Sequence, residues 1–179
     1  MKIKTLIIIC CSWLMLSCNS EPTLQKYFVQ HTEDANFISL DISPSVLKIK
    51  PDQLTDAEKK AFDSFNKMNI LAFQLDSVNA TKYETEKTNV EKILKDEQYQ
   101  SLIKFGSGKE GISVSYIGTE EKIDEIILFA KNDKTGFAVA RILGNKMTPT
   151  DMIQFVGILQ KTDFDLDQLK PLKDMVSKK

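Results

Sequence analysis

Side chains that could do chemistry are few, because His31 is the single histidine of the chain. A metal site made of paired histidines, or a triad of nucleophile, base and orienting acid built in the usual way on histidine, needs more than this residue supplies. As a lone general base, His31 would need a positioned partner, and the sequence implies none nearby. We therefore expect a structural or surface histidine, and we predict no catalytic, cofactor-binding or metal-ligating residues.

Arg141 is the single arginine and lies in an apolar segment with the pattern of a strand. Its charge would need a carboxylate there, and Glu125 is the predicted partner. If residues 131–135 form a hairpin loop, Glu125 lies opposite Arg141 and Phe129 lies opposite Phe137. A cross-strand structural ion pair is the favoured interpretation. The alternative is a functional one, in which Arg141 clamps the carboxylate or phosphate of a ligand.

Two further clusters resemble ligand sites but lack essential parts. The glycines between Gly106 and Gly111 do not have the spacing of a phosphate loop, and a strand pattern follows them where such a loop needs a helix, so we expect a hairpin loop. Asp163, Asp165 and Asp167 alternate as in calcium loops, but the required glycine and the terminal glutamate are missing. Helix capping explains these aspartates.

Cys18 is the residue with the clearest chemical prediction. Lys2 and Lys4 precede an uncharged apolar run over residues 6–16, which is too short to cross a bilayer and is typical of a signal peptide. The segment Leu14–Cys18 then resembles the cleavage box of bacterial lipoproteins, although Leu16 stands where alanine or serine is usual. We expect residues 1–17 to be a lipoprotein signal peptide, and ordinary secretion is the alternative.

These predictions divide the chain into the signal peptide, a lipidated cysteine with a short tether at residues 18–23, and a single domain at residues 24–179. The other two cysteines, at positions 10 and 11, lie in the leader, so the domain has no disulfide and depends on its hydrophobic core. Cleavage removes two lysines and leaves 22 basic against 25 acidic residues. Because the two signs are interleaved, nucleic-acid binding is disfavoured.

Hydrophobic periodicity predicts an α+β fold, in which a largely antiparallel sheet packs against several helices. A capping box at Thr55 predicts a helix to about Met68, and a second strand follows at residues 69–75. Helices are also expected at residues 24–29, from 81, from 148 and from 162. Strands are expected at residues 37–42, 102–105, 112–117, 123–131 and 136–143. Both faces of the 123–143 hairpin are apolar, so one face is either covered by a second layer or available to a protein partner.

In the order of its elements the chain resembles domain of unknown function family 4252. The resemblance is carried by the segments Phe37–Ser43 and Glu125–Phe129 and by Leu143-Gly144 before Met147, and it extends from about Leu24 to Leu159. It implies a small exported lipoprotein of a Gram-negative envelope, with no assigned activity and no catalytic residues to carry over. The association of such proteins with envelope-stress or sigma-factor regulation implies a sensing or binding role.

We therefore expect an uncharacterised, membrane-tethered envelope lipoprotein, anchored by acyl chains such as palmitate and located at the outer membrane. Its expected role is that of a non-enzymatic binding or interaction module without a cofactor. A lipid or small-molecule carrier is one alternative and would require a cavity of several hundred Å³. A carboxylate-dependent hydrolase is the other, and would require two facing carboxylates, one with a raised pKa.

Overall fold

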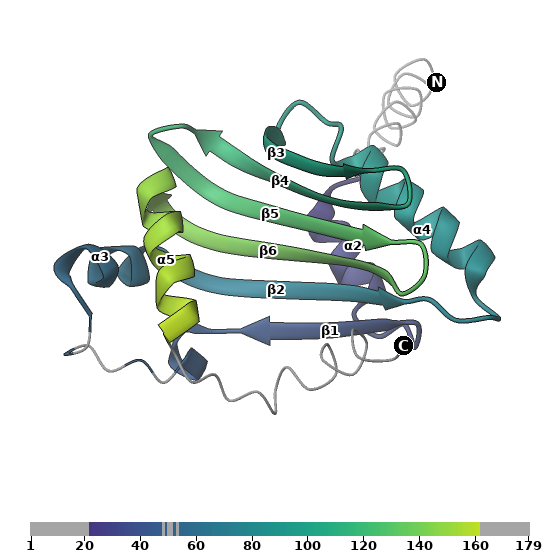
Figure 1. Ribbon diagram of the computed structural model, residues 1–179, viewed down its shortest axis with the longest axis horizontal. Helices are drawn as coiled ribbons and strands as arrows, with labels where there is room; N and C mark the ends of the chain where they lie inside the picture. The colour runs from purple at the N-terminus through teal and green to yellow at the C-terminus, as the bar shows by residue number, and fades with distance from the viewer. Residues whose placement is uncertain (1–21, 48, 50–51, 53, 162–179) are drawn as a thin grey trace, which may run out of the picture.

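The computed structural model describes residues 22–47, 49, 52 and 54–161. The predicted signal peptide, Cys18, the helix expected from Thr162 and the three aspartates of residues 163–167 lie outside this part of the chain. Figure 1 shows the described elements, which follow one another in this order: α2 (Leu24–His31), β1 (Phe37–Ile42), the 3-10 turn η2 (Pro44–Leu47), α3 (Asp56–Ser64), β2 (Phe65–Gln74), α4 (Ala80–Ile93), β3 (Gln100–Ser107), β4 (Glu110–Thr119), β5 (Lys122–Asn132), β6 (Gly136–Met147) and α5 (Pro149–Lys161).

The strands form one six-stranded sheet in the order β1-β2-β6-β5-β4-β3, and every neighbouring pair is antiparallel. The predicted α+β class with a largely antiparallel sheet is therefore confirmed. Strands β3 to β6 form a meander of consecutive hairpins, whereas β1 and β2 come from the N-terminal half and complete the sheet beside β6. Among the described strands, β1 and β3 are the edges.

One face of the sheet packs against α2 and α4, which lie behind the strands in Figure 1; we call it the α2/α4 face. Its centre is aromatic: the rings of Phe73 and Phe137 stack with centroids 5.6 Å apart, and Phe37 meets Phe73 edge-on at 5.1 Å. Burial of each such ring stabilises the fold by about 1.5–3 kcal/mol. The helices contribute Leu24, Tyr27, Phe28, Tyr83, Val90 and Ile93 to the same core.

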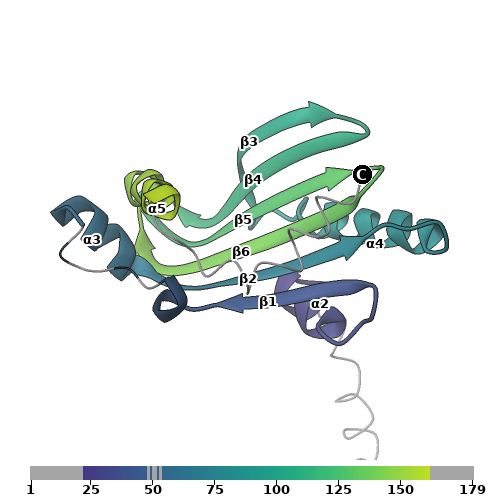
Figure 2. The same cartoon turned by 60° about the horizontal axis from the view of Figure 1, so that its bottom comes forward.

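The opposite face, which we call the α3/α5 face, is covered by described helices at one end only (Figures 1 and 2). There the ring of Phe155 in α5 packs on that of Phe65, with centroids 4.5 Å apart. Met152 of α5 packs against a cluster that includes Ile126. Toward the turn of the β3–β4 hairpin, away from both helices, Ile103, Phe105 and Ile112 on this face are each more than half exposed.

The predicted helix starts at Thr55 and Thr148 are correct, whereas the helix expected from Thr81 begins at Ala80, and the expected capping box of Thr81 and Glu84 is absent. Thr55 and Glu58 form the expected reciprocal pair at the start of α3. Thr148 and Asp151 form the same arrangement before α5, because the Thr148 hydroxyl accepts from the Asp151 amide while the Asp151 carboxylate accepts from the Thr148 amide. None of the described helices is long and apolar enough to span a membrane.

The helix predicted to run to Met68 is too long. Helix α3 ends at Ser64, and the chain is already extended at Phe65, where β2 begins. From Lys67 onward β2 pairs with β6. This long-range pairing, together with the packing of Phe65 under α5, outweighs the local helical spacing of the apolar residues.

The predicted register of the β5–β6 hairpin is wrong by two residues. Phe129 lies opposite Val139, not opposite Phe137. The cause is a tighter turn, since Asn132 pairs with Gly136 and only three residues connect them. Because side chains alternate with a period of two, a shift of two residues leaves every side chain on its expected face.

Candidate binding surfaces on the β3–β4 hairpin

The β3–β4 hairpin carries large apolar side chains on its α3/α5 face. Phe105 is 75% exposed and lies opposite Ile112, which is 53% exposed; Ile103, two residues before Phe105, is 52% exposed. All three share a face with Val114, which lies in the apolar cluster beneath α5. We call Ile103, Phe105 and Ile112 the hairpin patch.

The α2/α4 face of the same hairpin is built of small residues. Apart from Lys104, the residues of this face that lie next to the C-terminal end of α4 are serines and glycines: Ser101, Gly106, Gly111, Ser113 and Ser115. Helix α4 and β5 carry larger residues nearby, so the missing side-chain volume leaves an open groove of about 280 Å³ between the C-terminal end of α4 and the hairpin. Leu94 and Phe129 form its apolar wall. We call this space the α4 groove.

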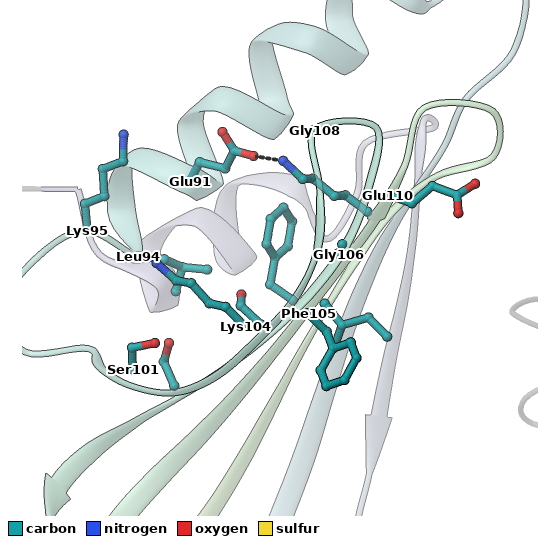
Figure 3. Close-up of a pocket in the computed structure, with 15 residues that line it drawn as sticks. Glu91, Leu94, Lys95, Ser101, Lys104, Phe105, Gly106, Gly108 and Glu110 are labelled. Carbon is teal, nitrogen blue, oxygen red and sulfur yellow. Dashed lines mark hydrogen bonds and ion pairs between the residues drawn. The ribbon is translucent and has the colours of Figure 1, made fainter.

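The charged residues at the α4 groove are mostly lysines (Figure 3). Lys131 is neutralised by Glu91, whose carboxylate lies 2.6 Å from the ammonium. Lys104 reaches from β3 toward Leu94, whereas the ring of Phe105 points away from α4. Within the described residues, neither Lys95 nor Lys104 forms an ion pair. Among the described residues, Lys104 is therefore the uncompensated cation that faces the groove, whereas the Lys95 side chain points away from it in Figure 3.

Arg141 and Glu125, the pair expected from the sequence, lie on the α2/α4 face and are both buried. Arg141 Nε and Nη2 donate to the two oxygens of Glu125 at 2.6 and 2.9 Å, and the guanidinium lies 5.4 Å from the centroid of the Phe28 ring. Two parallel charge-assisted bonds satisfy the carboxylate and fix the guanidinium plane. This arrangement supports the structural interpretation and gives no support to the anion clamp.

His31 has charged neighbours that the sequence did not indicate, so the expectation of no nearby partner is wrong. Its Nε2 lies 3.4 Å from Glu86 of α4, and its Nδ1 lies 3.6 Å from Asp34. Glu86 also accepts a hydrogen bond of 3.0 Å from the hydroxyl of Tyr27. The contacts with Glu86 join α2 to α4 across more than 50 residues of sequence, a separation at which local spacing carries no information.

The pKa values around this cluster have physical causes. Hydrogen bonds from Lys82 and from Asn36 hold the pKa of the Asp34 carboxyl well below its usual range. Burial, reinforced by the charge of Glu86, raises the pKa of the Tyr27 hydroxyl. The hydroxyl of Tyr83 in α4 donates a hydrogen bond to Asp133 in the β5–β6 turn, and this bond lowers the pKa of the Asp133 carboxyl. Neither Asp34 nor Asp133 is therefore the carboxyl with a raised pKa that the hydrolase alternative requires.

The described residues contain no cluster of three or more histidine, cysteine or acidic side chains arranged to hold a metal ion. The glycines from Gly106 to Gly111 form a hairpin turn, as predicted, with φ of +85° at Gly106 and +52° at Gly108. The sequence did not predict the α4 groove. Its signal was present, because small residues alternate with large apolar ones from Ser101 to Tyr116, but the position of α4 above them depends on tertiary packing.

Comparisons with other proteins give one match. No curated protein and no solved structure matches the chain. The model of the family described as "Domain of unknown function (DUF4252)" matches residues 27–155, which include every strand and end within α5. The match covers most of the chain and agrees with the resemblance inferred from the order of elements, so the protein belongs to the DUF4252 family.

Proposed function

We propose that the protein is a non-enzymatic binding module, tethered to the outer membrane of the cell envelope through lipid on Cys18, and that the hairpin patch holds a partner protein. The observation that carries the proposal is the exposure of Phe105 beside Ile103 and Ile112 on an edge hairpin. Large apolar side chains grouped on a soluble domain mark interaction surfaces. A role in envelope-stress regulation is compatible with this function and is part of the proposal.

The edge position of β3 indicates how a partner would bind. Residues 101–106 are all exposed, and β3 has a described neighbour on one side only. The backbone groups on its outer side are available to an added strand, a mode in which backbone hydrogen bonds supply affinity and alternate side chains supply specificity.

The side chains of β3 define the chemistry of the added strand. Phe105 points to the α3/α5 face and Lys104 to the opposite face. A matching segment therefore alternates apolar residues, which cover Ile103 and Phe105, with polar residues, which face the other side of the sheet. We propose an extended protein segment of this type as the partner.

The proposed tether leaves the hairpin patch accessible. Helix α2 begins beside the start of β3, where the amide of Leu24 donates to the hydroxyl of Tyr99 at 3.1 Å. Helix α2 lies on the α2/α4 face, which is the side of the sheet opposite to the Phe105 ring. Five residues separate Cys18 from Leu24 and can extend roughly 18 Å. A membrane-bound domain can therefore present the hairpin patch away from the lipid surface.

Site-specific photo-crosslinking in cells tests the proposal. A photoreactive phenylalanine analogue is placed at Phe105, at Ile112 and, as a matched control, at Val78, which is 90% exposed and lies outside the hairpin. We expect one protein adduct of defined mass from the two hairpin positions and none from Val78. Adding Ile103→Asp should abolish the adduct while the purified variant keeps its circular dichroism spectrum.

The identity of the adduct decides the outcome. Mass spectrometry should find a foreign protein crosslinked through a segment of alternating apolar and polar residues. Adducts of equal yield at Val78, adducts with lipid alone, adducts with a second copy of this chain, or no adduct at all would each contradict the proposal.

A further inference from the structure

We infer that the α4 groove is a second binding site, on the opposite side of the hairpin from the patch, and that it takes a small amphiphile with a single negatively charged carboxylate. The site needs neither the partner protein nor the lipid anchor. Three features carry the inference: the volume of the groove, the serine hydroxyls on its floor and its charge.

The volume of the α4 groove results from the small size of the residues on its floor. Gly111 and Gly106 lie opposite each other in the hairpin, and no side chain rises from either toward α4. A Cβ added at Gly111 would lie 3.3 Å from the carbonyl oxygen of Phe105 and 3.6 Å from the side chain of Lys131, so even a methyl group would be tight there. The groove of about 280 Å³ equals the liquid volume of about nine water molecules, which suits a ligand of about that many non-hydrogen atoms.

Three serine hydroxyls on the groove floor make no hydrogen bond within the described part of the chain. Ser115 is only 6% exposed, and its hydroxyl makes no hydrogen bond to a described residue. The hydroxyls of Ser101 and Ser113, on the same floor, are also unbonded within this part of the protein. These hydroxyls can therefore donate to, or accept from, a molecule bound in the groove.

The charge of the groove selects an anion with one carboxylate. The Glu91 carboxylate forms an ion pair of 2.6 Å with Lys131, and the Glu110 carboxylate accepts a hydrogen bond of 2.9 Å from the side-chain amide of Asn132. Lys95 and Lys104 are left without carboxylate partners among the described residues. One carboxylate at the Lys104 ammonium would compensate the charge that faces the groove without introducing excess negative charge near the C-terminal end of α4, where the helix dipole disfavours it.

The apolar wall selects the remainder of the ligand. Leu94 and Phe129 line the groove next to the serine floor, and Phe129 is itself nearly buried. A short hydrocarbon chain can pack against this wall while its head group reaches Lys104 and the hydroxyl of Ser101. An anion without an apolar part would leave Leu94 and Phe129 exposed to water, and its binding would lack the free energy gained by burying apolar surface.

Isothermal titration calorimetry of the soluble domain with sodium octanoate tests the inference, with octanol as the uncharged control and octylammonium as the cationic one. We expect saturable binding of one octanoate per chain and no measurable binding of the two controls. Lys104→Gln should weaken octanoate binding about tenfold, because it removes a charge-assisted hydrogen bond. Lys109→Gln is the matched control, since Lys109 lies in the same hairpin but not at the groove.

A filling variant separates the site from a general charge effect. Ser113→Val places a strand-favouring side chain on the groove floor and should abolish octanoate binding without lowering the melting temperature. Equal binding of octanoate and octanol would overturn the inference. Several weak sites per chain, equal effects of the two lysine substitutions, or full binding by a folded Ser113→Val variant would do the same. Photo-crosslinking from Phe105 is unaffected by these outcomes, so the two proposals fail separately.

Discussion

Arg141 of β6 holds Glu125 of β5 through two parallel hydrogen bonds of 2.6 and 2.9 Å, although the two residues are not opposite each other in the sheet. Arg141 lies opposite Ile127, and Glu125 lies opposite Leu143, so the pair is a diagonal one. Only a long side chain with a planar, forked head group can bridge that diagonal with two bonds. The guanidinium thereby joins the two central hairpin strands beneath Phe28 of α2.

Arg141→Lys should lower the free energy of unfolding by about 1–3 kcal/mol, because a lysine cannot reproduce both bonds and leaves part of a buried carboxylate unsatisfied. Chemical denaturation followed by circular dichroism measures the change. The double substitution Arg141→Leu with Glu125→Leu should recover part of the loss seen with either leucine alone, since it removes both charges. An unchanged melting temperature for Arg141→Lys would contradict the structural role of the pair.

Alkaline pH should destabilise the protein through Tyr27. Burial and the adjacent Glu86 raise the folded-state pKa of its hydroxyl above the ordinary value of about 10. The stabilisation from the neutral hydroxyl is therefore complete below pH 10 and is lost as the pH rises from 10 toward the folded-state pKa. We expect the free energy of unfolding to fall between pH 10 and 11.5 and to fall less steeply in Tyr27→Phe.

The control for this experiment is Tyr116→Phe, whose hydroxyl donates to the neutral side chain of Gln100 at 2.7 Å. It removes a tyrosine hydroxyl without removing a carboxylate contact. Equal alkaline slopes for the wild type and Tyr27→Phe, measured by urea unfolding at each pH, would refute the assignment to Tyr27.

Gly136 is the glycine at which substitution should be most harmful. Its φ is +122°, and an added Cβ would lie 1.9 Å from the carbonyl oxygen of Phe73 in the neighbouring strand. Gly136→Ala should therefore destabilise the fold by about 2–4 kcal/mol, because backbone strain and a backbone clash act together. Gly157→Ala in α5 is the matched control, since its Cβ would meet nothing within 4 Å and alanine favours the helix by about 0.5–1 kcal/mol. Thermal unfolding of the two variants should give shifts of opposite sign.

Cys18→Ser should release the protein from membranes if Cys18 carries the lipid anchor. Cell fractionation would place the variant in the soluble fraction, and metabolic labelling with palmitate would give no signal on it. Cys11→Ser, in the predicted leader, should leave both membrane association and labelling unchanged. Retention of the Cys18 variant in the membrane fraction would contradict the tether.

The sequence predicted those features of the fold that depend on local rules. Capping residues at Thr55 and Thr148 located helix starts, and alternating apolar residues located the strands of the meander. The same local rules placed Glu125 and Arg141 on one face. They could not give the register, because whether three or five residues close the β5–β6 turn depends on the positive φ of Gly136 and its contact with β2.

Features that depend on long-range packing were not predicted. The helical spacing of apolar residues past Ser64 is real, but pairing with β6 turns that segment into β2. The neighbours of His31 and the α4 groove both require the position of α4 relative to other elements. A pattern in one segment cannot report which helix will lie above it.

The alternation in β3 and β4 also restricts how this family can change length. One extra residue between Lys104 and Phe105 would move every later side chain of β3 to the opposite face of the sheet. The ring of Phe105 would then enter the α4 groove, and Gly106 would lie on the α3/α5 face. The hairpin patch would lose its apolar side chain, and the α4 groove would lose its open volume, through the same insertion. Related chains should therefore tolerate point substitutions in these strands far better than single-residue insertions, and length variation should concentrate in the connection between α4 and β3.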